Sequence, residues 1–236
     1  MKFAIIAAGE GSRLREEGYK VPKGLVEVAG MPMIDRIISI CKEFEPESIS
    51  CIVNEESPEL AEHIRSIVNG TELNMVIKST PGSMHSFYHL KEFLTDERFC
   101  LFTVDSIFDS AEFREYIEYS VEHTEYDGVL AVTSYIDDEK PLYVELNGSG
   151  EITGFYDQPG DNRNFVTGGI YFFRPKVFKA LDRCIDEGLH KLRNFQRMLI
   201  DMNFRIKAYK FKKIVDVDHK EDIRKAEAFL NKRNDY

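Results

Sequence analysis

A loop that combines two glycines, a hydroxyl and an arginine follows the first apolar run of the chain, residues 3–8. The carboxyl ends of strands are where open α/β sheets bind their ligands. Glycine lets the backbone amides approach a polyphosphate, and Arg13 and Lys23 can supply positive charge to its oxygens. The loop therefore predicts a nucleoside triphosphate site. The nucleotide-binding residues expected in it are Ala7, Ala8, Gly9, Gly11, Ser12 and Arg13.

Other glycine-rich loops fit this sequence less well. A dinucleotide-binding loop has a third glycine where this chain has Leu14, and its second strand ends in an acidic ribose ligand where this chain has Asn54. A P-loop needs GxxxxGK[ST], which the sequence lacks. The remaining alternative to a nucleotide-binding loop is that Gly9 and Gly11 are ordinary turn glycines.

Two aspartates stand at the ends of apolar runs and can hold a metal ion. Asp105 ends the run at residues 99–104, and Asp216 follows Ile214 and Val215. Mg²⁺ takes one or two carboxylates and completes its shell with water and phosphate oxygens. We therefore expect Asp105 and Asp216 to bind Mg²⁺, with Asp218 as a weaker candidate. Each could instead only cap the helix that follows it.

The elements that must position these residues alternate between strand and helix. Apolar runs predict strands at 3–8, 48–53, 73–77 and 99–104, and helical spacing predicts helices at 32–44, 58–68 and from Ser83 to Leu94. Such alternation predicts an α/β fold with a doubly wound, mostly parallel mixed sheet of Rossmann-like type.

The second half is less regular and predicts an antiparallel extension of the sheet. Strands are expected at 128–135, 142–146, 152–156 and 165–173, with a hairpin turn at 147–150. Helices are expected at 110–123, 177–187, 192–202 and 220–232.

Composition limits the partners and the compartment. The 236 residues include 31 basic and 41 acidic side chains, for a net charge of −10, so we expect neither a nucleic-acid nor a membrane partner. The apolar start is shorter than a signal-peptide core, and no run is long enough to span a bilayer. The four widely spaced cysteines lack zinc-site pairing, and we expect them to be reduced core residues. A cytoplasmic protein is expected, and a homo-oligomer is left open.

The glycine loop and Arg13 are followed by a Pro22-Lys23 pair, whose lysine lies ten residues after that arginine. This joint pattern resembles the signature of the NTP-transferase family, the sugar-phosphate nucleotidylyltransferases or NDP-sugar pyrophosphorylases. The resemblance extends over most of the chain. It implies a single nucleotidyltransferase domain of GT-A-like fold over residues 1–236. About 1–125 would form the nucleotide-binding half, and about 126–236 the acceptor-side half.

The resemblance also implies roles for individual residues. Asp105 and Asp216 match the metal-binding aspartates, and Gly82 and Ser83 lie in the segment that matches the base-binding loop. Arg13, Lys23 and Asp105 would be catalytic. The acceptor-binding residues implied are Asp157, Gln158, Thr167, Gly168, Gly169 and Tyr171.

One departure bears on the substrate. Asp157 and Gln158 stand where the family has glutamate and lysine, so the cation that holds a sugar 1-phosphate must come from elsewhere, such as Arg163 or Arg174. Phosphocholine is an alternative acceptor, for which Tyr156 and Tyr171 are the available cage residues.

The activity implied is transfer of a nucleoside monophosphate from an NTP to a phosphorylated small molecule, with a sugar 1-phosphate favoured, Mg²⁺ as cofactor and pyrophosphate as product. The alternatives are a phosphocholine cytidylyltransferase-like enzyme, a catalytically silent ligand-sensing relative and a glycosyltransferase of similar architecture.

Overall fold

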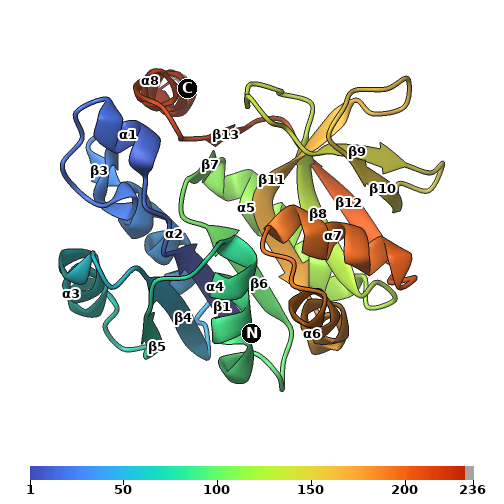
Figure 1. Cartoon of the computed structure of the whole chain (residues 1–236), viewed down its shortest axis with the longest axis horizontal. Coiled ribbons are helices and arrows are strands. Elements are labelled where there is room, and N and C mark those ends of the chain that lie inside the picture. The colour runs from blue at the N-terminus through green and yellow to red at the C-terminus, as the bar shows by residue number, and fades with distance from the viewer. Residues whose placement is uncertain (232–236) are drawn as a thin grey trace.

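Four parallel strands form one side of a large sheet in this computed structural model, which describes residues 1–231 (Figure 1). Across the sheet their order is β5 (Glu72–Ile77), β4 (Ser48–Val53), β1 (Lys2–Ala7) and β6 (Phe99–Thr103). Every residue of β1 and β4 is buried. Their near-continuous apolar sequences fit this position, because a central parallel strand is covered on both faces.

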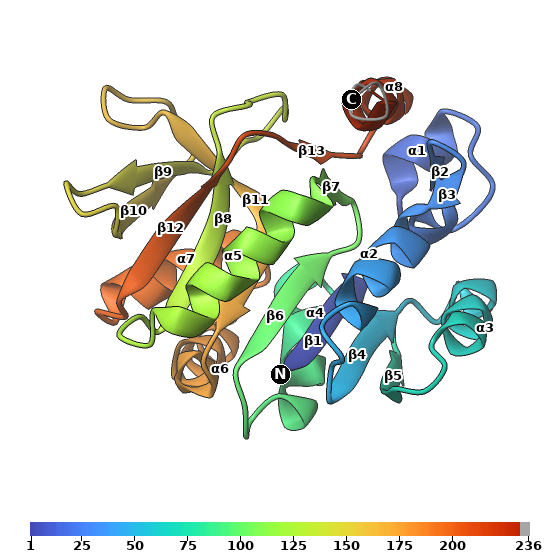
Figure 2. The same ribbon diagram turned by 180° about the vertical axis from the view of Figure 1, so that it is seen from behind.

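Helices cover both faces of the sheet, as Figures 1 and 2 show from opposite sides. Alternate side chains of β1 enter the two cores, so that Phe3 packs on one side and Ala4 on the other. The helices on the side of Phe3 are α2 (Met33–Lys42), α3 (Pro58–Ile67) and α5 (Ser110–Glu122). Those on the side of Ala4 are α4 (Ser83–Leu90), α6 (Phe178–Asp186) and α7 (Leu192–Asp201).

Antiparallel pairing begins beyond β6. The long strand β11 (Phe165–Phe173) pairs antiparallel with both β6 and β8 (Gly128–Thr133), and β12 (Ile206–Phe211) then pairs parallel with β8. A hairpin of β9 (Tyr143–Leu146) and β10 (Ile152–Tyr156) joins β11 through β9. The structure confirms the predicted doubly wound, mostly parallel mixed sheet with an antiparallel extension.

The carboxyl-terminal segment returns to the amino-terminal half. β13 (Ile214–Asp216) pairs antiparallel with β7 (Ser106–Phe108), which places Asp216 opposite Ser106. Helix α8 (Lys220–Asn231) then packs beside the short helix α1 (Ser12–Glu16), where Leu14 and Ile223 share a small hydrophobic core (Figure 1). Residues about 200 positions apart in the chain therefore meet at one edge of the sheet.

The structure contains several elements that the sequence analysis did not predict. The segment expected as a continuous glycine loop contains α1, and four strands were not predicted: β7, β12, β2 (Glu27–Val28) and β3 (Met31–Pro32). β12 alternates apolar and polar residues and gains its partner only through tertiary pairing with β8. The predicted element bounds otherwise agree within about four residues, and Lys232, the last residue of the final predicted helix, lies outside the described residues.

The cysteines behave as the sequence predicts. Cys41, Cys51, Cys100 and Cys184 are all buried and unbridged, and burial raises the pKa of the Cys51 thiol to about 12. Within residues 1–231, no helix has both the length and the apolar character needed to cross a membrane.

The contact between β11 and β13 can be tested by overpacking. A Cβ built on Gly168 would overlap Cδ1 of Ile214. We expect Gly168→Ala to lower the free energy of unfolding by about 1–3 kcal/mol in urea denaturation, because the close-packed core cannot take up the methyl group. In an Ile214→Ala background the same change should cost less by at least about 1 kcal/mol. An equal cost in both backgrounds would contradict this packing.

Candidate active site

The glycine loop closes onto Lys23. After β1 the chain turns, and α1 begins at Ser12. Gly11 has a left-handed φ of 60°, and a Cβ on it would lie 3.0 Å from Cβ of Lys23. Only glycine combines that φ with so close an approach at little cost. The loop and the lysine are therefore positioned by each other.

A cavity of about 470 Å³ opens at the carboxyl ends of β1, β4 and β6. Lys23 and Asp105 line it. The predicted nucleotide-binding residues that line it are Ala8, Gly9, Gly11, Ser12, Arg13, Gly82 and Ser83. The exception is Ala7, which packs in the hydrophobic core beneath the loop.

Asn54 at the end of β4 holds the loops around this cavity, a role that the sequence analysis missed. Its amide donates to the Ala8 carbonyl over 3.3 Å, and its Oδ1 accepts from the Ser79 hydroxyl and the Glu56 backbone amide, each at 2.9 Å. Asn54 is buried. The signal for this role in the sequence is that Asn54 is a polar residue directly after an apolar strand.

The segment around Gly82 contacts the turn before α7. A Cβ on Gly82 would lie 2.6 Å from the backbone oxygen of His190, which precedes α7. No larger residue fits there without moving that turn. The two halves of the chain therefore meet in backbone contact beside the cavity.

Lys23 is the centre of a buried charge cluster. Its Nζ lies 2.6 Å from Oδ2 of Asp105 and 2.5 Å from Oδ1 of Asp218, and the side chain is 9% exposed. The other oxygen of Asp218 pairs with Arg13 at 2.5 Å. Asp218, a secondary candidate from the sequence, thus joins the two cations expected to bind phosphates.

The pKa values follow this arrangement. Burial alone would lower the pKa of Lys23, but the surrounding aspartates outweigh it and raise that pKa. Burial would raise the pKa of Asp105, but the Lys23 ammonium lowers it. The lysine and Asp105 are therefore a charged pair at neutral pH.

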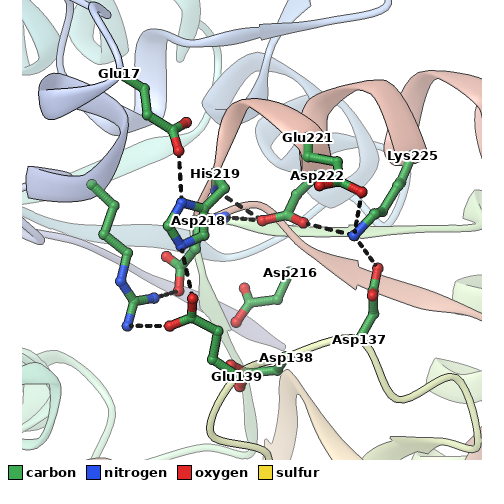
Figure 3. A pocket seen from close by; sticks show the side chains of 11 residues that line it. Glu17, Asp137, Asp138, Glu139, Asp216, Asp218, His219, Glu221, Asp222 and Lys225 are labelled. Atoms are coloured by element: carbon green, nitrogen blue, oxygen red, sulfur yellow. Dashed lines mark hydrogen bonds and ion pairs between the residues drawn. The ribbon is translucent and has the colours of Figure 1, made fainter.

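Asp216 lies beside this pair without a cation of its own. The Val217 amide donates to the Asp105 carbonyl over 3.0 Å, which holds the two strand ends together. Among the residues drawn in Figure 3, none forms a hydrogen bond or ion pair with the Asp216 carboxylate. Desolvation and repulsion from Asp105 raise the pKa of Asp216 well above its usual range, although the residue is open to the cavity.

The donor set fits a hard divalent cation that shares its shell with phosphate. No cluster of three or more His, Cys, Asp or Glu residues with metal-binding geometry exists within residues 1–231. Asp105 and Asp216 provide two carboxylates, which is the number Mg²⁺ uses when substrate phosphates and water supply the other oxygens. The unbalanced charge at Asp216 is what such a cation would neutralise.

A second, acidic cavity of about 320 Å³ shares Arg13 and Asp218 with the first (Figure 3). Its walls come mainly from the loop after β8 and from the start of α8. Most of its charged groups are already paired. His219 contacts Glu17 at 2.8 Å, and Lys225 contacts Asp137 at 2.7 Å.

The predicted acceptor residues divide among three places. Thr167, Gly169 and Tyr171 line a cavity of about 340 Å³, called the acceptor cavity here for these predicted residues. It shares Ser83, Thr103 and Asp105 with the cavity of about 470 Å³ around the glycine loop. Gly168 lies in the packed contact with Ile214 and borders a small pocket. Asp157 and Gln158 line a more open hollow of about 720 Å³ beside α7.

The expected substitute cations lie elsewhere. The Arg163 guanidinium stacks 3.3 Å above the Tyr156 ring, and Arg174 donates to the Tyr126 carbonyl over 2.9 Å. Neither arginine lines the acceptor cavity, nor does Tyr156. The basic residues that do line it are Lys140, Lys191 and Arg193. The sequence analysis missed these three because they come from a loop and a helix start without a recognisable motif.

A family model for nucleotidyl transferases matches residues 2–233. The chain belongs to the nucleotidyl transferase family. This confirms the family that the glycine loop and the Pro22-Lys23 pair indicate. Enzymes of the nucleotidyl transferase family generally use a divalent metal ion, which agrees with the donor set described above.

Individual relatives are distant. The low-salt glycan biosynthesis nucleotidyltransferase Agl11 of Haloferax volcanii is 25% identical over 187 residues, which are 78% of this chain and 52% of Agl11. The UTP–glucose-1-phosphate uridylyltransferase AglF of the same organism is 27% identical over 184 residues, 76% of this chain and 74% of AglF. The chain thus spans about half the length of the first relative.

Among solved structures, the inositol-1-phosphate CTP transferase from T. maritima has a TM-score of 0.81 at 20% identity. The match covers 98% of this chain and 96% of that one. The similarity shows that the two chains share their fold.

The unbalanced charge of Asp216 predicts a stability effect. We expect Asp216→Asn to melt at a higher temperature than the wild type in EDTA, because one of two adjacent carboxylates is neutralised. Added Mg²⁺ should stabilise the wild type more than the variant, because it binds the folded site. Differential scanning fluorimetry measures both.

Asp186→Asn, an exposed change on α6, is the matched control and should show neither effect. A lower melting temperature for Asp216→Asn than for the wild type in EDTA would contradict the predicted repulsion.

Proposed function

We propose that this chain transfers a nucleoside monophosphate from an NTP to a phosphorylated small molecule, with a sugar 1-phosphate as the acceptor, and releases pyrophosphate. The observation that carries the proposal is the position of Lys23 and Asp105. Both line the cavity that holds the glycine loop, and Asp105 also lines the adjoining acceptor cavity. Two substrates bound in these cavities would meet at this pair.

The reaction requires no catalytic base. A phosphomonoester has its second pKa near ~6, so its oxygen is already anionic at neutral pH. That oxygen attacks the α-phosphorus, the bond from this phosphorus to the β-phosphate oxygen breaks, and pyrophosphate leaves. Catalysis then depends on alignment and charge neutralisation.

Each charged residue has a role in this scheme. Lys23 neutralises the α-phosphate, Arg13 binds the β- and γ-phosphates, and the glycine-loop amides border the same cavity. Asp105 and Asp216 would hold Mg²⁺, which supplies positive charge to the phosphate oxygens when bound. In the structure Asp218 forms ion pairs with both Arg13 and Lys23. The triphosphate must therefore displace the Asp218 carboxylate from these two side chains when it binds.

The choice of a sugar 1-phosphate rests on the relatives and on the acceptor cavity. AglF is described as acting on glucose 1-phosphate, and Agl11 as a nucleotidyltransferase of glycan biosynthesis. The acceptor cavity contains one aromatic ring, Tyr171. A quaternary ammonium cage uses several aromatic faces.

The proposal predicts pyrophosphate release that depends on the central pair. The protein is incubated with each of the four NTPs, Mg²⁺ and a panel of sugar 1-phosphates and phosphocholine. We expect release with at least one NTP and sugar 1-phosphate. Lys23→Ala and Asp105→Asn should each lower turnover by roughly 100-fold or more, because both act on the transition-state charge.

Circular dichroism and melting curves identify any variant that fails to fold. Absence of release with every pair would favour a ligand-sensing relative, and use of an NDP-sugar as donor would favour a glycosyltransferase. Near wild-type turnover in a folded Asp105→Asn variant would also overturn the proposal.

Arg13 has a separable effect on binding. We expect Arg13→Ala to weaken Mg–NTP binding by about tenfold, the loss of one charge-assisted contact. Calorimetry without acceptor measures it. Arg15→Ala is the control, because Arg15 lies on the same short helix but lines neither cavity. Equal affinities for the Arg13 and Arg15 variants would remove Arg13 from the phosphate site.

A further inference from the structure

The acceptor cavity contains an unpartnered buried amide. Gln196 on α7 is 2% exposed and lies beside the Tyr171 hydroxyl, but its Nε2 has no partner in hydrogen-bonding geometry among the described residues. The side chain lines the cavity together with Thr167 and Tyr171. A buried N–H without an acceptor is unfavourable, and most buried amides in folded proteins are paired. The cavity therefore offers a donor that a ligand oxygen can satisfy.

Two lysines at the same cavity have no counterion. Lys140 lies in the loop between β8 and β9, and Lys191 immediately precedes α7. Neither ammonium group has an ion pair or hydrogen bond within residues 1–231, whereas Lys23 has two aspartates. Both therefore have positive charge available for a ligand.

Arg193 holds the loop that carries Lys140, and its guanidinium is already occupied by that contact. Its guanidinium donates to Asp157 Oδ1 over 2.6 Å and to the Lys140 carbonyl over 2.8 Å, which ties the loop to α7. The Lys140 amide donates to Asp138 Oδ1 over 2.9 Å. The backbone of the loop is thus held from two sides, and the Lys140 ammonium is left beside the cavity.

We infer that Lys140 and Lys191 bind the phosphate of the acceptor and that the Gln196 amide donates to an acceptor hydroxyl. This rests on the proposed nucleotidyl transfer and assigns the side chains that recognise its acceptor, for which the family's motif residues Asp157 and Gln158 lie outside the acceptor cavity. A phosphate dianion beside Asp105 and Asp216 requires positive charge, and the two free lysines supply it. Hydroxyl oxygens match the Gln196 donor, whereas a trimethylammonium group offers no acceptor.

The first experiment measures the KM for the acceptor with glucose 1-phosphate as the probe, at saturating Mg–NTP. We expect Lys140→Met and Lys191→Met each to raise this KM by about tenfold, with the calorimetric Kd for Mg–NTP unchanged. Lys191→Arg should recover most of the affinity because it keeps the charge. Lys179→Met, an exposed change on α6 away from both cavities, is the control.

The second experiment separates phosphate binding from hydroxyl recognition. Gln196→Met keeps the side chain's length but removes the amide. We expect it to lower kcat/KM for glucose 1-phosphate by about tenfold and to leave kcat/KM for methyl phosphate unchanged. The two lysine variants should lower both values.

The outcomes distinguish this inference from the proposed function. If the wild type releases pyrophosphate but the lysine and glutamine variants keep its acceptor KM, nucleotidyl transfer stands and the inference is wrong. A wild type that prefers phosphocholine to glucose 1-phosphate overturns the role of Gln196 and the proposed sugar 1-phosphate acceptor, while nucleotidyl transfer itself stands. If no NTP supports turnover, the proposed function fails. Calorimetric binding of glucose 1-phosphate then decides the inference, which is supported only if the lysine variants lose that binding.

Discussion

Like charges held close together are the constraint on which this site depends. Asp105, Asp216 and Asp218 converge at one edge of the sheet, and one buried lysine is placed among them. Without Lys23 these carboxylates would repel each other with no cation placed between them. In this cluster Lys23 pairs with Asp105 and Asp218, and the Asp216 carboxylate has no ion pair among the described residues. The protein alone therefore does not neutralise the negative charge of the site. A bound divalent cation would supply the positive charge that Asp216 lacks.

The fold is arranged to bring these groups together. Lys23 follows the first strand, Asp105 ends the fourth parallel strand in chain order, and the other two aspartates belong to a segment near the end of the chain. Pairing of β13 with β7, and packing of α8 beside α1, carry that segment back across the sheet. The carboxyl-terminal helix is therefore part of the site's construction rather than a peripheral addition.

The amino-terminal and carboxyl-terminal halves of the chain meet in close backbone contact. Gly82 packs against the carbonyl of His190, just before Lys191 and α7. The segment expected to contact the base and the turn that provides a free lysine are thus neighbours. This proximity gives a physical route by which nucleotide binding and acceptor binding can be aligned at Asp105, which lines both cavities.

The sequence by itself determined the alternation of strands and helices, the family, and the candidate residues around Lys23. Apolar periodicity and glycine spacing are local properties, so they can be read without knowing what packs where. Only the tertiary structure decided the partners: Asp218 between Arg13 and Lys23, Asn54 across three loops, and the lysines beside Gln196. Strand β12 escaped prediction for the same reason, since its identity as a strand depends on β8. Side chains far apart in the chain carry no shared local pattern, and their meeting is fixed by strand order and helix packing.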